Sequence, residues 1–362
     1  MGRVFYATNR NPDNAANPTS FGIDFNGAQP GALTFGVADV AAPSGHDPQG
    51  LPFEASGPGD IQLSQGQAGD FSAAAKQQIL AGPPHLVVSV HGFQYLFWEA
   101  ISRADYVSRW LAEGQFANPN TIIAFTWPSA GVFSEYQRDW TYSTNSAGAL
   151  AAALSALKPL IDAFRAAHGQ AACVTLLAHS MGNHMLDVGL GALNVSAPAV
   201  YNRVILAAAD ESRNQMAPGN NLAKAQVLAD RVYVYYNNQD MALAASALVE
   251  HGFEDVRLGV DGPPNKDDFK NANVTFMNAS AAGVGPTTTE NSYDSEGHQY
   301  YRMIQEVRND ICAVMRGMAD SAIPNRIYRD DPHYNWENYW RIDTMTVPAA
   351  PPQFPQSSSR NR

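Results

Sequence analysis

Ser180 is the residue of this sequence whose neighbours best suit nucleophilic chemistry. It lies in Ala178-His179-Ser180-Met181-Gly182-Asn183, between an apolar run at 173–178 and a helical pattern at 182–193. Small residues two places before and two places after a serine permit a sharp, strained strand-to-helix turn that exposes the hydroxyl at a helix N-terminus. The same residues would also suit a serine that only caps the helix. A nucleophilic role therefore depends on finding a base and an acid elsewhere in the chain.

Candidates for that acid and base follow Ser180 in the sequence. A nucleophile on this kind of turn is followed in the chain first by its acid and then by its histidine. Asp240 and Asp210 both come shortly after apolar runs, and we predict Asp240 as the acid and Asp210 as the alternative. His298 follows the last apolar run and directly precedes a helical pattern, so we predict it as the general base. Asp240 could also cap the helix that begins after it, which is compatible with the acid role.

An oxyanion site needs two backbone N–H groups near the nucleophile. Met181, as the residue after Ser180, is predicted to supply one, and Phe93 in His91-Gly92-Phe93-Gln94 is predicted to supply the other. Gly92 would allow the backbone to turn this amide toward the site. His91 precedes the nucleophile in the chain, so we interpret it as bracing the loop rather than carrying protons.

Three side chains are predicted to contact a substrate: Trp127, Tyr142 and Gln94. Trp127 stands at the end of the apolar run 121–126, where it could form a pocket wall or belong to the core. Tyr142 could line the same mouth together with Tyr136 and Asp139, or these residues could form a solvated helix face.

The elements that must position these residues alternate along the chain. Unbroken apolar runs are typical of strands that are covered on both faces, and helical patterns between them indicate a parallel sheet flanked by helices. The predicted strands of that sheet are 86–90, 121–126, 173–178, 203–208, 231–236 and 273–277, and the predicted helices are 97–113, 144–168, 182–193, 240–250 and 299–316. Before them, 3–8 and 33–40 are predicted to form an antiparallel hairpin, and 41–70 is expected to be irregular.

We predict one α/β-hydrolase domain over residues 1–320, with a mostly parallel central sheet and helices on both faces. Within it, 252–272 is polar and is expected to be a surface insertion. Residues 321–362 are expected to form a C-terminal aromatic extension that packs on the domain, followed by a disordered tail.

The composition restricts the classes of partner. The 362 residues carry a net charge of −11, which argues against nucleic acid and anionic membranes as partners. We find no apolar run that predicts an integral membrane segment. No Cys/His spacing predicts a metal site, and no cofactor is expected. The first residues lack the pattern of a signal peptide, and this favours a cytoplasmic location. Secretion is the alternative if a signal peptide has been removed from the chain. The sequence does not predict an oligomeric state.

Several of these segments together resemble a known family. Residues 4–10, the His91-Gly92-Phe93 loop, residues 125–131 and the segment around Ser180 are similar to the bacterial α/β-hydrolase family catalogued as domain of unknown function 900. The resemblance extends to about residue 316 and implies an esterase-like or lipase-like enzyme with a triad at Ser180, Asp240 and His298. Gln94 departs from it, since the family usually has Asn there, and neither 252–272 nor the aromatic extension is matched.

The sequence thus predicts a serine hydrolase acting through an acyl-enzyme intermediate on small or short-chain carboxylic esters. The absence of a predicted lid helix favours small soluble substrates. An acyltransferase or thioesterase would use the same three residues. A catalytically silent scaffold that binds a ligand or a partner is the alternative from another class, but such a protein would be expected to lack one of the three.

Overall fold

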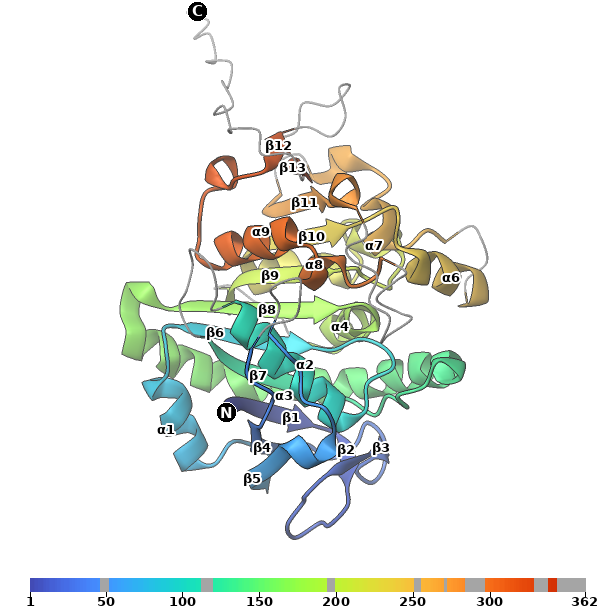
Figure 1. Ribbon diagram of the computed structural model, residues 1–362. Helices are drawn as coiled ribbons and strands as arrows, with labels where there is room; N and C mark the ends of the chain where they lie inside the picture. The colour runs from blue at the N-terminus through green and yellow to red at the C-terminus, as the bar shows by residue number, and fades with distance from the viewer. Residues whose placement is uncertain are drawn as a thin grey trace, which may run out of the picture.

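The unbroken apolar runs form the strands of one eleven-stranded sheet (Figure 1). The structure is a computed structural model that describes residues 1–45, 52–111, 120–193, 199–250, 255–269, 272–283, 297–328 and 338–343. The strands of the large sheet are β1 (Gly2–Thr8), β4 (Thr34–Val40), β5 (Ile61–Ala68), β6 (His85–Val90), β7 (Thr121–Thr126), β8 (Cys173–His179), β9 (Tyr201–Ala207), β10 (Ala229–Tyr236), β11 (Val274–Asn278), β12 (Arg326–Tyr328) and β13 (Tyr339–Ile342).

The strand order is β12-β13-β11-β10-β9-β8-β6-β7-β1-β4-β5. Every neighbouring pair from β13 to β1 is parallel, whereas β12, β4 and β5 are antiparallel to their neighbours. The predicted mostly parallel sheet is therefore confirmed, as is the antiparallel pairing of 3–8 with 33–40. In the chain between β1 and β4, a separate two-stranded sheet forms from β2 (Arg10–Pro12) and β3 (Phe21–Phe25).

Strand β5 was not predicted, because 41–70 was expected to be irregular. It forms one edge of the sheet, and most of its residues are exposed and polar. Its pairing with β4 shifts register between Phe35 and Val37, and Gln65 within it has a positive φ of 56°. Only Ile61 and Leu63 of this edge strand pack on the core, so the hydrophobic period in the sequence is too short to predict a strand.

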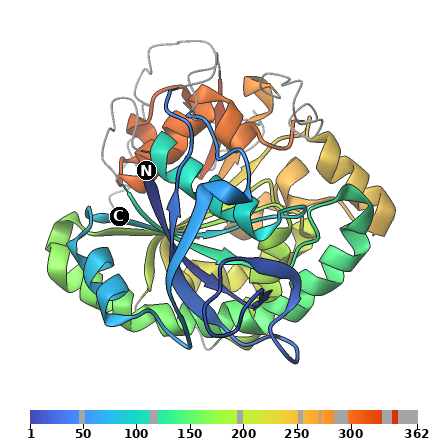
Figure 2. The same cartoon turned by 60° about the horizontal axis from the view of Figure 1, so that its bottom comes forward.

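Helices cover both faces of the sheet. Alternate residues of β6 point to opposite sides, with Val88 and Val90 in one buried cluster and Val87 in the other. Figure 2 shows α3 on one side of the sheet and α2 with the C-terminal helices on the other. The helices are α1 (Ala73–Ala81), α2 (Phe97–Trp110), α3 (Tyr136–His168), α4 (Met181–Ala192), α5 (Ala225–Leu228), α6 (Met241–Glu250), α7 (Leu258–Asp261), α8 (Tyr300–Met303) and α9 (Gln305–Met315).

Helix α3 corrects the expectation that no apolar run could cross a bilayer. The segment Phe133–Ala171 is long and apolar enough to do so by length and composition alone. However, 56% of its most apolar window is buried inside the fold, and α3 supplies residues such as Leu150 and Ile161 to the core. The core helix of a soluble protein has the same properties, so this one helix is weak evidence for a membrane.

The described part of 252–272 lies partly at the surface, for example at Asp267 and Asp268, and partly in the core. Arg257, Leu258 and Phe269 have at most 1% of their surface exposed. Gly259 also approaches the end of β9 so closely that an added Cβ would lie 2.4 Å from the Ala209 nitrogen. The polar residues of this segment predicted exposure, but its few apolar residues and Arg257 face inward.

The C-terminal extension joins the large sheet. Strand β13 pairs in parallel with β11, and β12 pairs with β13, so the predicted boundary at residue 320 does not separate two sheets. Tyr339 stacks on Phe276 of β11 with ring centroids 5.0 Å apart. The tail after residue 343, which was expected to be disordered, lies outside the described residues.

Candidate active site

Ser180 occupies the sharp turn between β8 and α4. Its φ of 55° and ψ of −129° are rarely adopted by a residue other than glycine, so the backbone here is strained. Two backbone hydrogen bonds hold it, from the Ser180 N–H to the Ala207 carbonyl at 3.1 Å and from the Asp210 N–H to the Ser180 carbonyl at 3.2 Å. The turn is thus stabilised by the end of the neighbouring strand β9.

The two glycines beside Ser180, Gly92 and Gly182, have no room for a Cβ atom. A Cβ added to Gly182 would lie 2.7 Å from the His91 carbonyl oxygen, and one added to Gly92 would lie 2.6 Å from Cβ of Ser180. Gly92 therefore brings the loop after β6 into direct contact with the serine. The sequence reasoning assigned no role to Asn183, whose buried side-chain amide donates to the Ala178, Ser180 and Ala207 carbonyls at 3.1–3.3 Å.

His298 and Asp240 form a hydrogen-bonded pair beside this turn. His298 Nδ1 lies 2.8 Å from Asp240 Oδ2, and the other oxygen of Asp240 accepts the Leu243 N–H at 3.0 Å. Asp240 is buried and caps α6 while it holds the histidine, so the two roles considered for it coexist. Because a carboxylate can only accept, Nδ1 carries a proton, and Nε2 is the nitrogen of the neutral ring that can act as a base.

His179 links this pair to the serine turn. Its ring lies 4.9 Å from the His298 ring, centroid to centroid, and it hydrogen-bonds the His298 backbone. Burial, followed by the neighbouring His298, holds the pKa of His179 well below its usual range, so His179 is neutral. The Ser180 hydroxyl itself forms no hydrogen bond within the described residues. Catalytic hydrogen bonds are often long in ligand-free enzymes and shorten when substrate binds.

Asp210, the alternative acid, has other partners. Its carboxylate accepts hydrogen bonds from Tyr136 at 2.7 Å and Ser246 at 2.6 Å, and Arg257 lies 3.5 Å away. The structure therefore pairs His298 with Asp240 and not with Asp210.

The two predicted oxyanion donors flank Ser180. Met181 is the first residue of α4, so its N–H has no partner within the helix. The Phe93 N–H has no acceptor among the described residues. These two amides are available to stabilise negative charge on a substrate oxygen.

His91 fixes the peptide that carries the Phe93 amide. Its Nδ1 lies 2.7 Å from the Gly92 carbonyl, and its Nε2 accepts the Trp127 N–H at 3.2 Å. Burial, aided by Arg10, lowers the pKa of His91 to about 3, so the ring is neutral with its proton on Nδ1. Since the carbonyl and N–H of a trans peptide point in opposite directions, holding the Gly92 carbonyl directs the Phe93 N–H away from His91. This geometry agrees with the interpretation of His91 as a bracing residue.

Comparison with known proteins identifies the family. The family model described as "Alpha/beta hydrolase of unknown function (DUF900)" matches residues 73–307. The chain belongs to this family. The match extends from the start of α1 to the start of α9 and includes the Ser180 turn, Asp240 and His298.

The comparisons of this α/β-hydrolase with solved structures and with curated proteins find little similarity. A solved structure of a hyperthermophilic esterase from the archaeon Pyrobaculum calidifontis is similar at 12% identity and a TM-score of 0.28, over 66% of this chain and 65% of that one. The similarity thus spans less than two thirds of that esterase. No curated protein matches.

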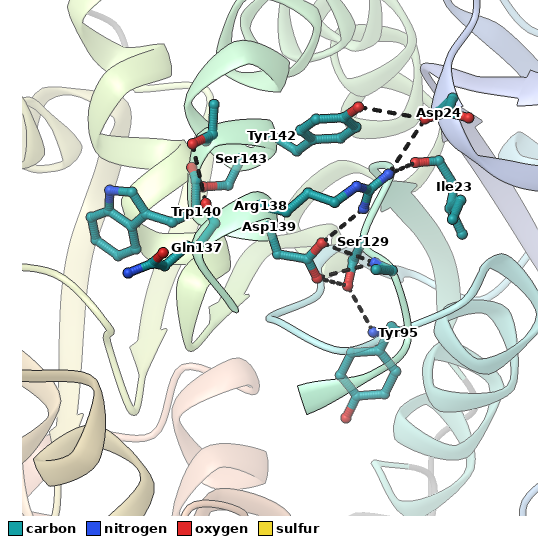
Figure 3. Close-up of polar contacts among 12 residues, drawn as sticks. Ile23, Asp24, Tyr95, Ser129, Gln137, Arg138, Asp139, Trp140, Tyr142 and Ser143 are labelled. Carbon is teal, nitrogen blue, oxygen red and sulfur yellow. Dashed lines mark hydrogen bonds and ion pairs between the residues drawn. The ribbon is translucent and has the colours of Figure 1, made fainter. Parts of the chain in front are cut away.

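The predicted substrate-binding residues of this α/β-hydrolase lie in different surroundings. Trp127 is fully buried and stacks on His91 with centroids 5.2 Å apart, which supports the core alternative over the pocket wall. Tyr142 lies beside Arg138 and Asp24 of β3 (Figure 3). Its ring centroid also lies 4.8 Å from that of Phe25. Gln94 lies in the loop beside Phe93 and has a positive φ of 66°.

Tyr136 is the aromatic residue of α3 that reaches the loop, since its ring lies 5.1 Å from that of Phe93. Phe133, which is 54% exposed, continues this aromatic surface outward. The described residues include no group of three or more His, Cys, Asp or Glu side chains arranged to hold a metal ion.

Proposed function

We propose that this protein is a serine hydrolase that cleaves carboxylic esters through an acyl-enzyme intermediate. Ser180 is the proposed nucleophile, His298 the general base and Asp240 the residue that orients the histidine. The observation that carries the proposal is the His298–Asp240 contact at 2.8 Å, together with the 4.9 Å between the ring centroids of His298 and His179, the residue before Ser180 in the strained turn. Membership of an α/β-hydrolase family supports the same reaction class.

In the proposed reaction, His298 Nε2 takes the proton of the Ser180 hydroxyl as the oxygen attacks the acyl carbonyl. The N–H groups of Phe93 and Met181 stabilise the resulting oxyanion, and Asp240 stabilises the imidazolium. The imidazolium then protonates the departing alcohol. Water attacks the acyl-enzyme with His298 again as base, which releases the acid and restores Ser180.

A fluorophosphonate probe tests the proposal directly, because it phosphonylates an activated serine. Wild type is expected to be labelled and Ser180→Ala is not, while both remain folded by circular dichroism. Folded wild-type protein that resists the probe as fully as the variant does would favour the catalytically silent alternative.

The proposed substrates are esters with short acyl chains. Chromogenic esters of increasing acyl length are expected to give the highest kcat/KM at the short end of the series. A rise with chain length would contradict this part of the proposal and leave the reaction class intact.

A further inference from the structure

The loop after β6 is held by side chains at successive peptide groups. Two consecutive N–H groups are accepted by side-chain oxygens: Tyr95 by Ser129 at 3.0 Å and Leu96 by Glu99 at 2.7 Å. The Gln94 N–H before them faces the Asp139 carboxylate and favours its charged form. The Phe93 N–H has no acceptor among the described residues. The loop is therefore held on one side of this amide by these contacts and on the other side by His91, which holds the Gly92 carbonyl.

Asp139 is the centre of this arrangement (Figure 3). It lies in the first turn of α3 and is fully buried. Its carboxylate accepts hydrogen bonds from the Ser129 hydroxyl and from the Ala130 N–H, the latter at 2.9 Å, and it faces the Gln94 N–H. Asp139 thus joins the loop after β6 to the loop after β7 and to the start of α3.

Gln94 needs such support because of its backbone conformation. A positive φ at a residue other than glycine is unfavourable and persists only where the surroundings impose it. The φ of Gln94 is 66°, and its N–H faces the buried carboxylate of Asp139. Without that acceptor, we expect the turn at Gln94 to relax and the Phe93 peptide to change direction.

Arg10 holds the carbonyl side of the same loops. Its buried guanidinium donates to the Tyr95 carbonyl at 2.6 Å, the Ser129 carbonyl at 3.2 Å and the Gly22 carbonyl at 3.1 Å. The buried Arg10 cation therefore binds backbone carbonyls of these loops, and the buried Asp139 carboxylate binds the Ala130 N–H and the Ser129 hydroxyl. Burial lowers the pKa of Arg10 to about 9, and the charge of Asp139 opposes this shift.

We propose that Asp139 and Arg10 are positioning residues that keep the Phe93 N–H directed toward the substrate oxygen before substrate binds. Neither touches the reacting atoms; both act through the loop backbone. The inference rests on the proposed function, because it assigns a purpose to the orientation of one amide. Preorganised donors of this kind are effective because the enzyme does not need to reorient them during the reaction.

Asp139→Asn tests the inference, with Asp24→Asn as the matched control. Both aspartates contact the Arg138 guanidinium, but only Asp139 reaches the loop, whereas the Asp24 side chain is 65% exposed. Loss of one oxyanion donor lowers kcat by about 10²–10³-fold, so we expect a fall of about 100-fold in kcat for Asp139→Asn with KM nearly unchanged. Hydrogen exchange of a peptide covering 92–97 should accelerate in this variant alone.

A second pair of variants separates positioning from general destabilisation. Glycine adopts a positive φ without strain, so the fall in kcat caused by Asp139→Asn should be smaller in a Gln94→Gly background than in the wild-type background. If Asp139→Asn does not fold, Ser129→Ala, which removes the acceptor of the Tyr95 N–H, takes its place.

The outcomes for the loop and for the proposed reaction are distinct. Wild-type kcat and exchange in both Asp139→Asn and Ser129→Ala would overturn the inference while leaving the hydrolase proposal intact. If wild type neither hydrolyses esters nor reacts with the probe, the hydrolase proposal is wrong. Equal exchange over 92–97 in Asp139→Asn and Asp24→Asn would then overturn the positioning of the loop as well.

Discussion

The conformation of Ser180 shows how a single strained residue depends on its neighbours. A φ of 55° is unfavourable for serine. Backbone hydrogen bonds to Ala207 and Asp210, and those of the Asn183 amide, hold the turn in this conformation. The turn places Ser180 at the end of the sheet, where only 4% of its surface is exposed. Catalysis at this residue would therefore depend on groups that never meet a substrate.

The choice between the two aspartates is tested by paired substitutions. Asp240→Asn removes the acceptor that fixes the His298 tautomer, and we expect kcat to fall by about 10⁴-fold, as in other triads. Asp210→Asn keeps His298 paired with Asp240 and should retain most of the activity. Steady-state kinetics on one chromogenic ester measures both, and the reverse ranking would assign the acid role to Asp210.

Gly92 offers a test of the contact between the loop and the serine. Gly92→Ala places a Cβ 2.6 Å from Cβ of Ser180, so either the loop or the turn must move. We expect loss of most ester hydrolysis and much slower labelling by the fluorophosphonate probe. Gly57→Ala is the control, because a Cβ at that position meets no atom within 4 Å. Labelling of Gly92→Ala at the wild-type rate would mean that this contact does not matter.

At the level of elements, the C-terminal extension is attached to the core by a buried ion pair. Arg326 of β12 makes two hydrogen bonds to Asp310 of α9, and both side chains are 1% exposed. Asp310 also accepts the Tyr235 hydroxyl, so α9, β10 and β12 meet at this carboxylate. Strands β12 and β13 are thus part of the folded unit.

Arg326→Met is expected to destabilise the protein by about 3–5 kcal/mol, because it leaves the Asp310 carboxylate buried without its cation. Arg3→Met is the control: its partner Asp39 lies at the surface, where such a pair contributes at most about 1 kcal/mol. Urea unfolding measures both. The double variant Arg326→Met/Asp310→Asn should recover much of the loss, and equal losses in the two single variants would contradict the attachment.

The sequence predicts those elements whose side chains repeat a buried pattern. Strands such as β8 and β10 are covered on both faces, so their apolar runs are visible without a structure. Strand β5 packs only Ile61 and Leu63 on the core and was missed. The positions of Asp240 and His298 could be predicted because chain order and strand ends restrict them. The roles of Asp139 and Arg10 could not, because each holds backbone groups that come together only in the folded chain.

At the scale of the whole molecule, buried carboxylates influence how stability varies with pH. Asp187 is 5% exposed, and burial, followed by the nearby Glu211, raises its pKa to about 7. An unfolded aspartate has a pKa of about 3.9, so between these values the folded chain holds a proton that the unfolded chain has lost. This group therefore stabilises the fold fully below about pH 4, and its contribution is lost as the pH rises to about 7.

Asp187→Asn removes that titration. Relative to wild type, the variant should gain stability between pH 4 and 8, by a few kcal/mol at most, since each unit of pKa corresponds to about 1.4 kcal/mol. The free energy of urea unfolding at several pH values measures this difference. Asp162→Asn, at an exposed side chain, should leave the dependence unchanged. A constant difference between Asp187→Asn and wild type across this range would contradict the assignment.

Strand β5 has a consequence beyond the fold of one chain. A free strand edge offers unpaired N–H and carbonyl groups to which another polypeptide can add, and fibres grow in this way. Strand β5 carries glutamines and a serine, has a positive φ at Gln65, and shifts its register with β4 at one point. Such an irregular and hydrophilic border is a poor template for a further strand, so this wide sheet can end at β5 without promoting aggregation there.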